Sequence, residues 1–418
     1  MHILILPSEF FITKENPTAG IFQFDQARVL VEKGHKVGVL ALKPLFTFRD
    51  LLVYLKLIIR GKGSPIELLK RVRNAMLPRP FAFQSTRILN INVIRYIGSH
   101  RENSYRDAQQ QKTLWDKNGL YAFNKYCKEN GRPDILYAHN MIFAGMVGEY
   151  LSNIANIPLV LQEHSSQHIK GSMLDDLNQL SSHYFNKIKN IFAVSPSLGF
   201  QLEKKYKLND GKIKWLPNVI SPEYEEVIPK KMYSSEGVFT FLNVGSLIEL
   251  KGQEELILAF DAAIKDEANL RLKIVGKGEL DGKLRQLILD LGIQDKVELL
   301  GYLNRSEIIK LMNNCDVIVS SSHYETFGVV LIEALSLGKP VIATRCGGPE
   351  CIVDNDNGVL IPSRDIEKMK LALLEMYSGI HRYDGVHIQK SLIGKFGKEA
   401  FYSRIEKICK KEISDHNN

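Results

Sequence analysis

The chain has 418 residues, more than one hydrophobic core usually supports, so we expect two domains. Hydrophobic residues make up 44% and charged residues 24%, the balance of an ordinary soluble globular protein and not of a disordered chain. The net charge is +8, and the five cysteines form no CxxC pair, which favours a reducing compartment over a disulfide framework.

The chain opens with a short apolar run, Met1–Pro7, that is too short for a secretory signal and predicts a first β-strand. No stretch of about 18 uncharged apolar residues follows, so we expect no segment that spans a bilayer. We therefore expect a cytoplasmic protein.

Apolar runs of strand length alternate with amphipathic runs of helix length, which predicts parallel sheets covered by helices. The segment 216–222, rich in Pro, Asn and Ser, predicts a linker between two such halves. We expect two doubly wound α/β domains that face each other across a cleft, at 1–220 and 221–396, with a helix at 397–418 returning to the first. The predicted strands are His2–Leu6, Lys36–Leu40, Ile135–Ala138, Pro158–Gln162, Ile191–Val194, Val238–Val244, Arg271–Val275, Lys296–Leu299, Val317–Ser320 and Pro340–Ala343.

An insertion at about 45–117 contains a strongly basic part. Residues 49–87 hold nine basic and two acidic side chains, interleaved with leucine and isoleucine. A basic, apolar helical segment of this kind binds anionic membrane surfaces. A solvated helical insertion packed on the N-terminal domain explains the same composition, and both interpretations stay open.

The segment 317–337 carries the clearest chemical pattern. An apolar strand leads into a small polar loop with Glu325, and then into an apolar helix whose single charge is Glu333. A buried carboxylate is costly unless hydrogen-bonded, and ribose hydroxyls would satisfy it. Eight helical residues span roughly 12 Å, whereas the paired carboxylates of a retaining glycosidase lie about 5–5.5 Å apart. Glu325 and Glu333 therefore suit two contacts along one elongated ligand.

With this Glu-x7-Glu pattern, the sequence resembles the retaining glycosyltransferases of family 4, which have the GT-B fold. Four further motifs of the second half resemble that family in the same order. They are Val244-Gly245-Ser246-Leu247 with Lys251-Gly252, Val275-Gly276-Lys277-Gly278, Gly347-Gly348-Pro349-Glu350 and Asn357-Gly358-Val359-Leu360. The first half resembles the family more loosely.

The resemblance implies a role for each motif. Glu325 would contact hydroxyls of the transferred sugar, Glu333 would hold the ribose, and Lys251 would neutralise the leaving diphosphate. Gly245 belongs to the phosphate-binding loop and Gly276 to the turn that approaches the base. Backbone N–H groups at a helix N-terminus would face the diphosphate, as the helix dipole independently favours. These groups belong to Phe327, Gly328, Val329 and Val330.

Ser246 departs from the family pattern, in which an arginine often supplies a second phosphate contact. Either Ser246 donates a weaker hydrogen bond, or a basic residue elsewhere takes over. For Lys251 the alternative is a solvated surface lysine at the start of a helix.

Three residues of the first half are candidate site residues. Gly20 resembles the family's N-terminal glycine loop at the donor phosphates, although a plain turn before a helix explains it equally well. His164 follows an apolar strand and resembles the histidine that the family places beside the reacting sugar. His139 has the same placement and would line the acceptor cleft. Ser195 reads as a helix N-cap followed by Pro196.

We therefore expect a hexosyltransferase-type enzyme that moves a sugar from a nucleotide-sugar, most simply a UDP-sugar, to a saccharide. The basic segment favours a lipid-linked acceptor, as in polysaccharide, O-antigen or capsule assembly. We expect no cofactor, no metal and no nucleic-acid partner. The alternatives are a soluble transferase for a small metabolite, a silent sugar-nucleotide-binding scaffold, and, more remotely, a sugar-nucleotide epimerase of the same fold.

Overall fold

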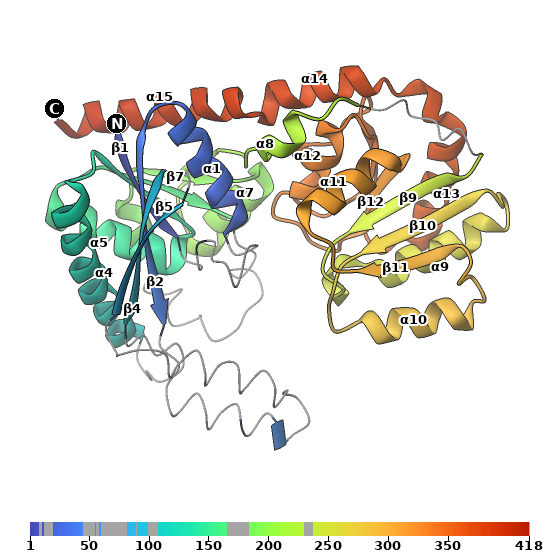
Figure 1. Cartoon of the computed structure of the whole chain (residues 1–418), viewed down its shortest axis with the longest axis horizontal. Coiled ribbons are helices and arrows are strands. Elements are labelled where there is room, and N and C mark those ends of the chain that lie inside the picture. Colours follow the sequence, from blue (N-terminus) through green and yellow to red (C-terminus); the bar gives the residue numbers. More distant parts are fainter. Residues whose placement is uncertain are drawn as a thin grey trace. The chain divides into compact units, whose positions relative to one another are not determined.

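The structure is a computed structural model that describes residues 1–7, 11, 20–44, 55, 58–59, 82–88, 90–98, 108–164, 184–229 and 237–417. The chain forms two compact units, each with its own parallel sheet (Figure 1). The first unit holds Met1–Ala193, Gly199–Leu216 and Tyr402–Asn418, and the second holds Val194–Leu198 and Pro217–Phe401. The expectation of two α/β domains with parallel sheets is confirmed.

The first sheet has the strand order β3-β4-β2-β1-β5-β6-β7-β8, and every neighbouring pair except β3–β4 is parallel. Its strands are β1 (His2–Pro7), β2 (Lys36–Pro44), β3 (Ala82–Ile88), β4 (Ile91–Gly98), β5 (Ile135–His139), β6 (Leu159–Glu163), β7 (Asn190–Ala193) and β8 (Ile213–Trp215). The central strands β1, β5 and β6 are buried along their whole length. Burial on both faces explains why they read as continuous apolar runs in the sequence.

The helices of the first unit connect these strands. They are α1 (Ile21–Glu32), α4 (Ala108–Asn130), the short turn η1 (Met141–Gly145), α5 (Met146–Ala155) and most of α7 (Pro196–Tyr206) and of α15 (Lys398–Asn417). Helices α4 and α5 lie side by side (Figure 1). The hydroxyl of Ser195 accepts the N–H of Leu198 at 3.1 Å, so the predicted N-cap of α7 is confirmed.

The second sheet is wholly parallel, with the order β11-β10-β9-β12-β13-β14. Its strands are β9 (Phe239–Val244), β10 (Leu270–Val275), β11 (Val297–Gly301), β12 (Val317–Ser320), β13 (Val341–Arg345) and β14 (Gly358–Pro362). Its helices are α8 (Pro222–Glu225), η2 (Glu249–Lys251), α9 (Gln253–Ile264), α10 (Asp281–Asp290), α11 (Arg305–Asn314), α12 (Val329–Ser336), η3 (Pro349–Cys351), α13 (Ile366–Gly379), η4 (Ile380–Arg382) and α14 (Gly385–Phe396). One continuous apolar core joins α9, α10 and α13 to the sheet, while α12 packs against α14.

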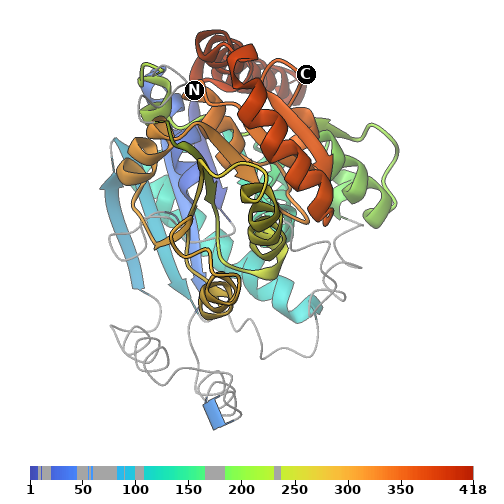
Figure 2. The same ribbon diagram turned by 90° about the vertical axis from the view of Figure 1, so that its right-hand side faces the viewer.

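All ten predicted strands are present, with ends within four residues of the prediction. Four strands were not predicted: β3, β4, β8 and β14. Two of these, the edge strand β3 and its neighbour β4, form an antiparallel pair (Figure 2). The sequence of β3, AFQSTRI, is largely polar and lacks the apolar run of a buried strand, which explains its omission. The sequence of β4, INVIRYIG, is mostly apolar, and its omission has no such explanation.

The helical interpretation of the basic segment is wrong at its end, because Ala82–Ile88 is the edge strand β3. Most of the segment 49–81, and with it the membrane-surface prediction, lies outside the described residues. No helix of the described ranges is both long enough and apolar enough to cross a membrane. All five cysteines are free thiols.

Candidate active site

The loops that follow the parallel strands of the second sheet lie along one edge of that sheet, where α/β proteins bind ligands. The loop after β9 lies between those after β10 and β12, because β9 pairs with both strands. Every donor-site residue predicted for the second unit lies in one of these loops or in the helix α12.

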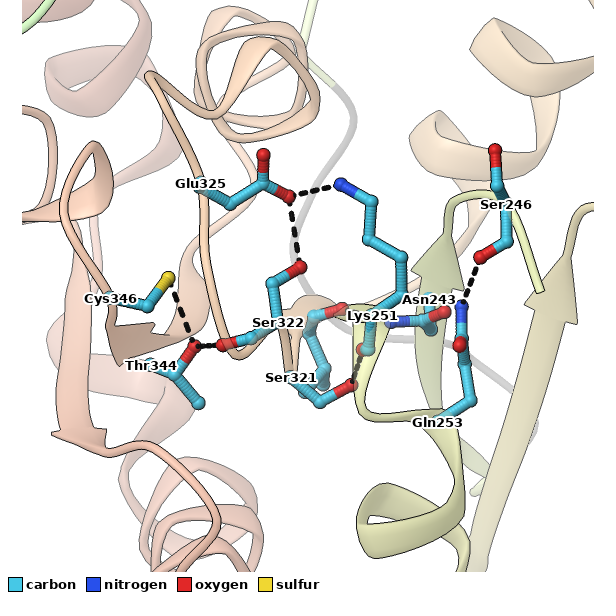
Figure 3. Close-up of polar contacts among 10 residues, drawn as sticks. Asn243, Ser246, Lys251, Gln253, Ser321, Ser322, Glu325, Thr344 and Cys346 are labelled. Atoms are coloured by element: carbon cyan, nitrogen blue, oxygen red, sulfur yellow. Dashed lines mark hydrogen bonds and ion pairs between the residues drawn. The ribbon is translucent and has the colours of Figure 1, made fainter. Parts of the chain in front are cut away.

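An ion pair between Lys251 and Glu325 joins two of these loops (Figure 3). The same Glu325 oxygen, Oε1, accepts a hydrogen bond from the hydroxyl of Ser322 at 2.8 Å. The side chains of Lys251 and Glu325 are 26% and 19% exposed. The structure therefore brings the predicted cation and the predicted sugar-binding carboxylate together at a position that a ligand can reach.

Backbone contacts hold the Lys251 loop against the Glu325 loop. The hydroxyl of Ser321 donates to the carbonyl of Lys251 at 2.8 Å, and the N–H of His323 donates to the carbonyl of Leu250 at 2.8 Å. Gly252 has φ +60°, and a Cβ there would overlap the carbonyl of Ser321. The His323 ring lies close to Gly252, with Nε2 at 3.0 Å from Oε1 of Glu255.

The backbone of Glu325 is also fixed, by the loop that follows β13. Its N–H donates to the carbonyl of Cys346 at 3.2 Å, and its carbonyl accepts the N–H of Gly348 at 2.8 Å. A Cβ at Gly348 would overlap the backbone of Phe327. Burial raises the pKa of the Cys346 thiol to about 12, and the nearby carboxylate of Glu325 adds to the shift. Cys346 is therefore protonated at neutral pH and is no nucleophile.

Helix α12 begins directly after this junction. Gly328 is its N-cap, with φ +107°, and Phe327 is buried. Val329 and Val330 form the first turn, whose N–H groups have no acceptor within the helix and carry the positive end of its dipole. Glu333 lies one turn further along and is 9% exposed. The geometry presents a helix N-terminus beside the Lys251–Glu325 pair.

The loops after β9 and β10 interlock at the predicted phosphate and base positions. The N–H of Gly245 donates to the carbonyl of Val275 at 2.9 Å, and a Cβ at Gly276 would overlap the carbonyl of Gly245. The amide of Gln253 donates to the carbonyl of Ser246 at 3.1 Å (Figure 3). The Ser246 residue itself is exposed.

In the first unit, the two predicted histidines meet. Nδ1 of His139 lies 2.9 Å from Nε2 of His164, and the ring of Phe22 packs on His164 with centroids 4.6 Å apart. Burial and the neighbouring His164 hold the pKa of His139 well below its ordinary value. Gly20 is the N-cap of α1, two residues before Phe22, and has φ +68°.

Glu163 belongs to this part of the site, although no role was predicted for it. Its carboxylate is fully buried and accepts the N–H of Met141 at 2.5 Å and that of His164 at 2.8 Å. It thus joins the loops that follow β5 and β6. The loop that follows β5 is strained, because Asn140 and Phe143 have φ of +75° and +65°. The signal was available, since Glu163 immediately precedes His164 at the strand end.

Among the described residues, no group of three His, Cys, Asp or Glu side chains lies close enough together to hold a metal ion. The candidate site of the second unit includes the ammonium group of Lys251, the carboxylates of Glu325 and Glu333, and the N-terminus of α12. The first unit presents two imidazoles. Groups of this kind bind a phosphorylated sugar compound through charge and hydroxyl contacts.

Comparison with known proteins assigns the family. Residues 19–224 match the family model Glycosyltransferase Family 4, and residues 225–381 match Glycosyl transferases group 1. Over 286 residues the chain is 31% identical to an uncharacterized glycosyltransferase of Methanocaldococcus jannaschii, covering 67% of this chain and 73% of that one. The chain belongs to glycosyltransferase family 4. The predicted family and the predicted enzyme class are confirmed.

Two further comparisons bear on this glycosyltransferase. It is 27% identical over 252 residues to the D-inositol 3-phosphate glycosyltransferase of Pseudarthrobacter chlorophenolicus, covering 56% of this chain and 59% of that one. The crystal structure of Anabaena HepE in complex with UDP matches with a TM-score of 0.69 at 18% identity, covering 98% of this chain and all of HepE. The chain thus has the GT-B fold that was predicted.

Proposed function

We propose that this family 4 glycosyltransferase transfers a sugar from a UDP-sugar to a saccharide acceptor with retention of anomeric configuration. The observation that carries the proposal is the Lys251–Glu325 ion pair beside the N-terminus of α12. A sugar diphosphate needs positive charge at its phosphates and hydrogen-bond acceptors at its hydroxyls, and this arrangement offers both. HepE, which has the same fold, binds UDP.

In the proposed reaction the bond between the anomeric carbon and the diphosphate oxygen breaks, and the acceptor oxygen bonds to that carbon on the same face. The acceptor proton passes to the departing phosphate oxygen. Glu325 then binds sugar hydroxyls, Lys251 and the α12 N-terminus stabilise the growing negative charge, and Glu333 binds the ribose. Lys251 and the helix dipole contribute positive charge at the diphosphate, and we propose that no metal takes part.

In the first unit, we propose that His164 lies beside the reacting sugar and that His139 fixes its ring. Gly20, at the start of α1, gives the donor phosphates close access to the backbone. Glu163 supports both roles, because it holds the backbone of His164 in place.

The test is a thermal-shift panel of UDP, GDP and ADP with wild type and Glu333→Ala. A ligand that binds the folded state raises the melting temperature. The proposal expects a clear shift with UDP that the variant lacks, and an α-configured product from an α-configured donor by NMR. A shift with GDP or ADP alone would reassign the donor, and a trapped glycosyl-enzyme in intact mass spectrometry would refute the same-face reaction.

For the acceptor we propose a lipid-linked saccharide in polysaccharide, O-antigen or capsule assembly, at the cytoplasmic membrane surface. Support comes from the sequence, in which residues 49–87 combine nine basic side chains with apolar ones. Binding to vesicles of phosphatidylglycerol, lost when these basic residues are changed to Gln, would support it. Full activity on free sugars without vesicle binding would refute it.

The second candidate is a small phosphorylated metabolite as acceptor. It is favoured by the relative that is named a D-inositol 3-phosphate glycosyltransferase. Product formation with inositol phosphate in the absence of lipid would favour this candidate.

A further inference from the structure

The proposed diphosphate site is short of positive charge. Ser246 offers only a hydroxyl, and the charge of Lys251 is already balanced by Glu325. A diphosphate ester carries more than one negative charge, and charged donors bind it much better than neutral ones. A second cation would therefore have to come from a neighbouring loop.

Lys277 lies in the loop directly beside Ser246. Its carbonyl accepts the N–H of Leu247 at 3.0 Å, and the carbonyl of Leu247 in turn accepts the N–H of Leu280 at 3.1 Å. A Cβ at Gly278 would overlap the carbonyl of Leu247. The backbone of the β10 loop is thus bonded to the residue that follows Ser246, which fixes the main chain of Lys277 beside the uncharged position. The side chain of Lys277 extends to Tyr302, which follows β11.

The ammonium group of Lys277 is available. The residue is exposed, and among the described residues no acidic side chain pairs with it. Its Nζ lies 5.1 Å from the ring centroid of Tyr302, which is itself 51% exposed. An exposed cation–π contact is weak, so a phosphate would readily displace it. The two loops, 245–252 and 276–280, contain two basic residues, Lys251 and Lys277. They also contain two exposed acidic residues, Glu249 and Glu279.

Another exposed cation of this sheet edge, Arg345, is placed less well. Arg345 is the last residue of β13, which lies two strands from β9 in the sheet. The strand β10, which precedes Lys277, is the direct neighbour of β9. Neighbouring strands are about 5 Å apart, so two strands put Arg345 about 10 Å from the end of β9. Counted from the β9 loop that carries Ser246, this spacing favours Lys277; counted from β12, β13 is the direct neighbour.

We propose that Lys277 is the second cation of the donor-diphosphate site, supplying from the β10 loop the charge that position 246 lacks. This inference rests on the proposed function. The cation–π contact with Tyr302 holds the ammonium group while the site is empty, and the phosphate oxygens take it over when the donor binds.

The test compares wild type, Lys277→Gln, the double variant Lys277→Gln/Ser246→Arg and the control Lys296→Gln. Lys296 is half-buried, its ammonium group donates to the carbonyl of Ala268 at 2.7 Å, and it lies at the opposite edge of the same sheet, before β11. Calorimetry measures the binding of UDP, GDP and ADP, and ligand-observed NMR measures the binding of the corresponding nucleosides.

We expect Lys277→Gln to weaken the best-bound diphosphate about tenfold, as loss of one charged hydrogen bond does, and to leave nucleoside binding unchanged. Adding Ser246→Arg should restore the affinity, and Lys296→Gln should change nothing. Unchanged diphosphate binding, or an equal loss for the nucleoside, would overturn the role of Lys277. Wild type that binds none of the diphosphates would overturn the proposed function itself.

Discussion

Lys251 and Glu325 lie 74 residues apart in the sequence, yet they form an ion pair at the centre of the candidate donor site. The pairing means that each side chain restrains the other before a donor arrives. Both groups are then already in place for charges and hydroxyls of the ligand, which is the condition for electrostatic stabilisation without reorganisation.

Neutralising Glu325 and neutralising Lys251 should have different effects on UDP affinity and on the transfer rate. We expect Glu325→Gln to retain or increase affinity for UDP, because Lys251 is released from its partner, while the transfer rate falls about 10²–10³-fold. Lys251→Met should weaken UDP binding about tenfold. The control Lys265→Met, which breaks an exposed ion pair with Asp261 on α9, should change neither quantity. Weaker UDP binding by Glu325→Gln would contradict the assignment.

Glu333 should report on the ribose. Wild type is expected to bind UDP more tightly than its 2′,3′-dideoxy analogue, because the analogue lacks the hydroxyls that the buried Glu333 is proposed to bind. In Glu333→Gln the preference should fall to less than about a third of its value. Calorimetry with the two ligands measures this. An equal preference in both proteins would place Glu333 outside the ribose contact.

The histidine pair predicts a pH dependence of stability. Because the pKa of His139 lies well below 6.5, the folded protein binds fewer protons than the unfolded chain when the pH falls below that value. The free energy of unfolding must then decrease with falling pH, by at most about 1.4 kcal/mol per pH unit for one histidine. Well above pH 6.5, where the imidazole is neutral in the unfolded chain too, this contribution is constant.

Melting temperatures measured between pH 5 and pH 8 can check this dependence. We expect His139→Gln to lose less stability on acidification than wild type. The control His416→Gln, exposed on α15, should follow wild type. Parallel pH curves for wild type and His139→Gln would refute the attribution.

The close packing of Gly348 on the backbone of Phe327 gives a prediction that does not depend on charged side chains. In Gly348→Ala the new methyl group would overlap the backbone of Phe327, so we expect the N-terminus of α12 to shift. UDP affinity should fall at least about tenfold, and stability should fall by about 1–3 kcal/mol. Gly282→Ala on α10 meets nothing within 4 Å and should be neutral or stabilising in thermal unfolding and UDP titration. Equal behaviour of the two variants would contradict the packing argument.

The local parts of the donor site could be read from the sequence, and the long-range parts could not. Glu325 and Glu333 share one strand–loop–helix segment, so their placement followed from spacing. The contact between Lys251 and Glu325 depends on β9 lying beside β12, which no local pattern encodes. His139 and His164 were each predicted at a strand end, but their contact required β5 to pair with β6. The strand β3 was missed because an exposed edge strand lacks the apolar run of a buried one.

The interlocked glycines bear on how donor specificity can be redesigned. Gly252 lies against Ser321, Gly276 against Gly245, and Gly348 against Phe327, and in each case the neighbour is backbone. A loop grafted singly from a homologue would meet one or two unaltered backbone partners across these contacts. Exchange of donor preference should therefore succeed when 245–252, 276–280, 321–328 and 346–350 are transplanted together as one cassette.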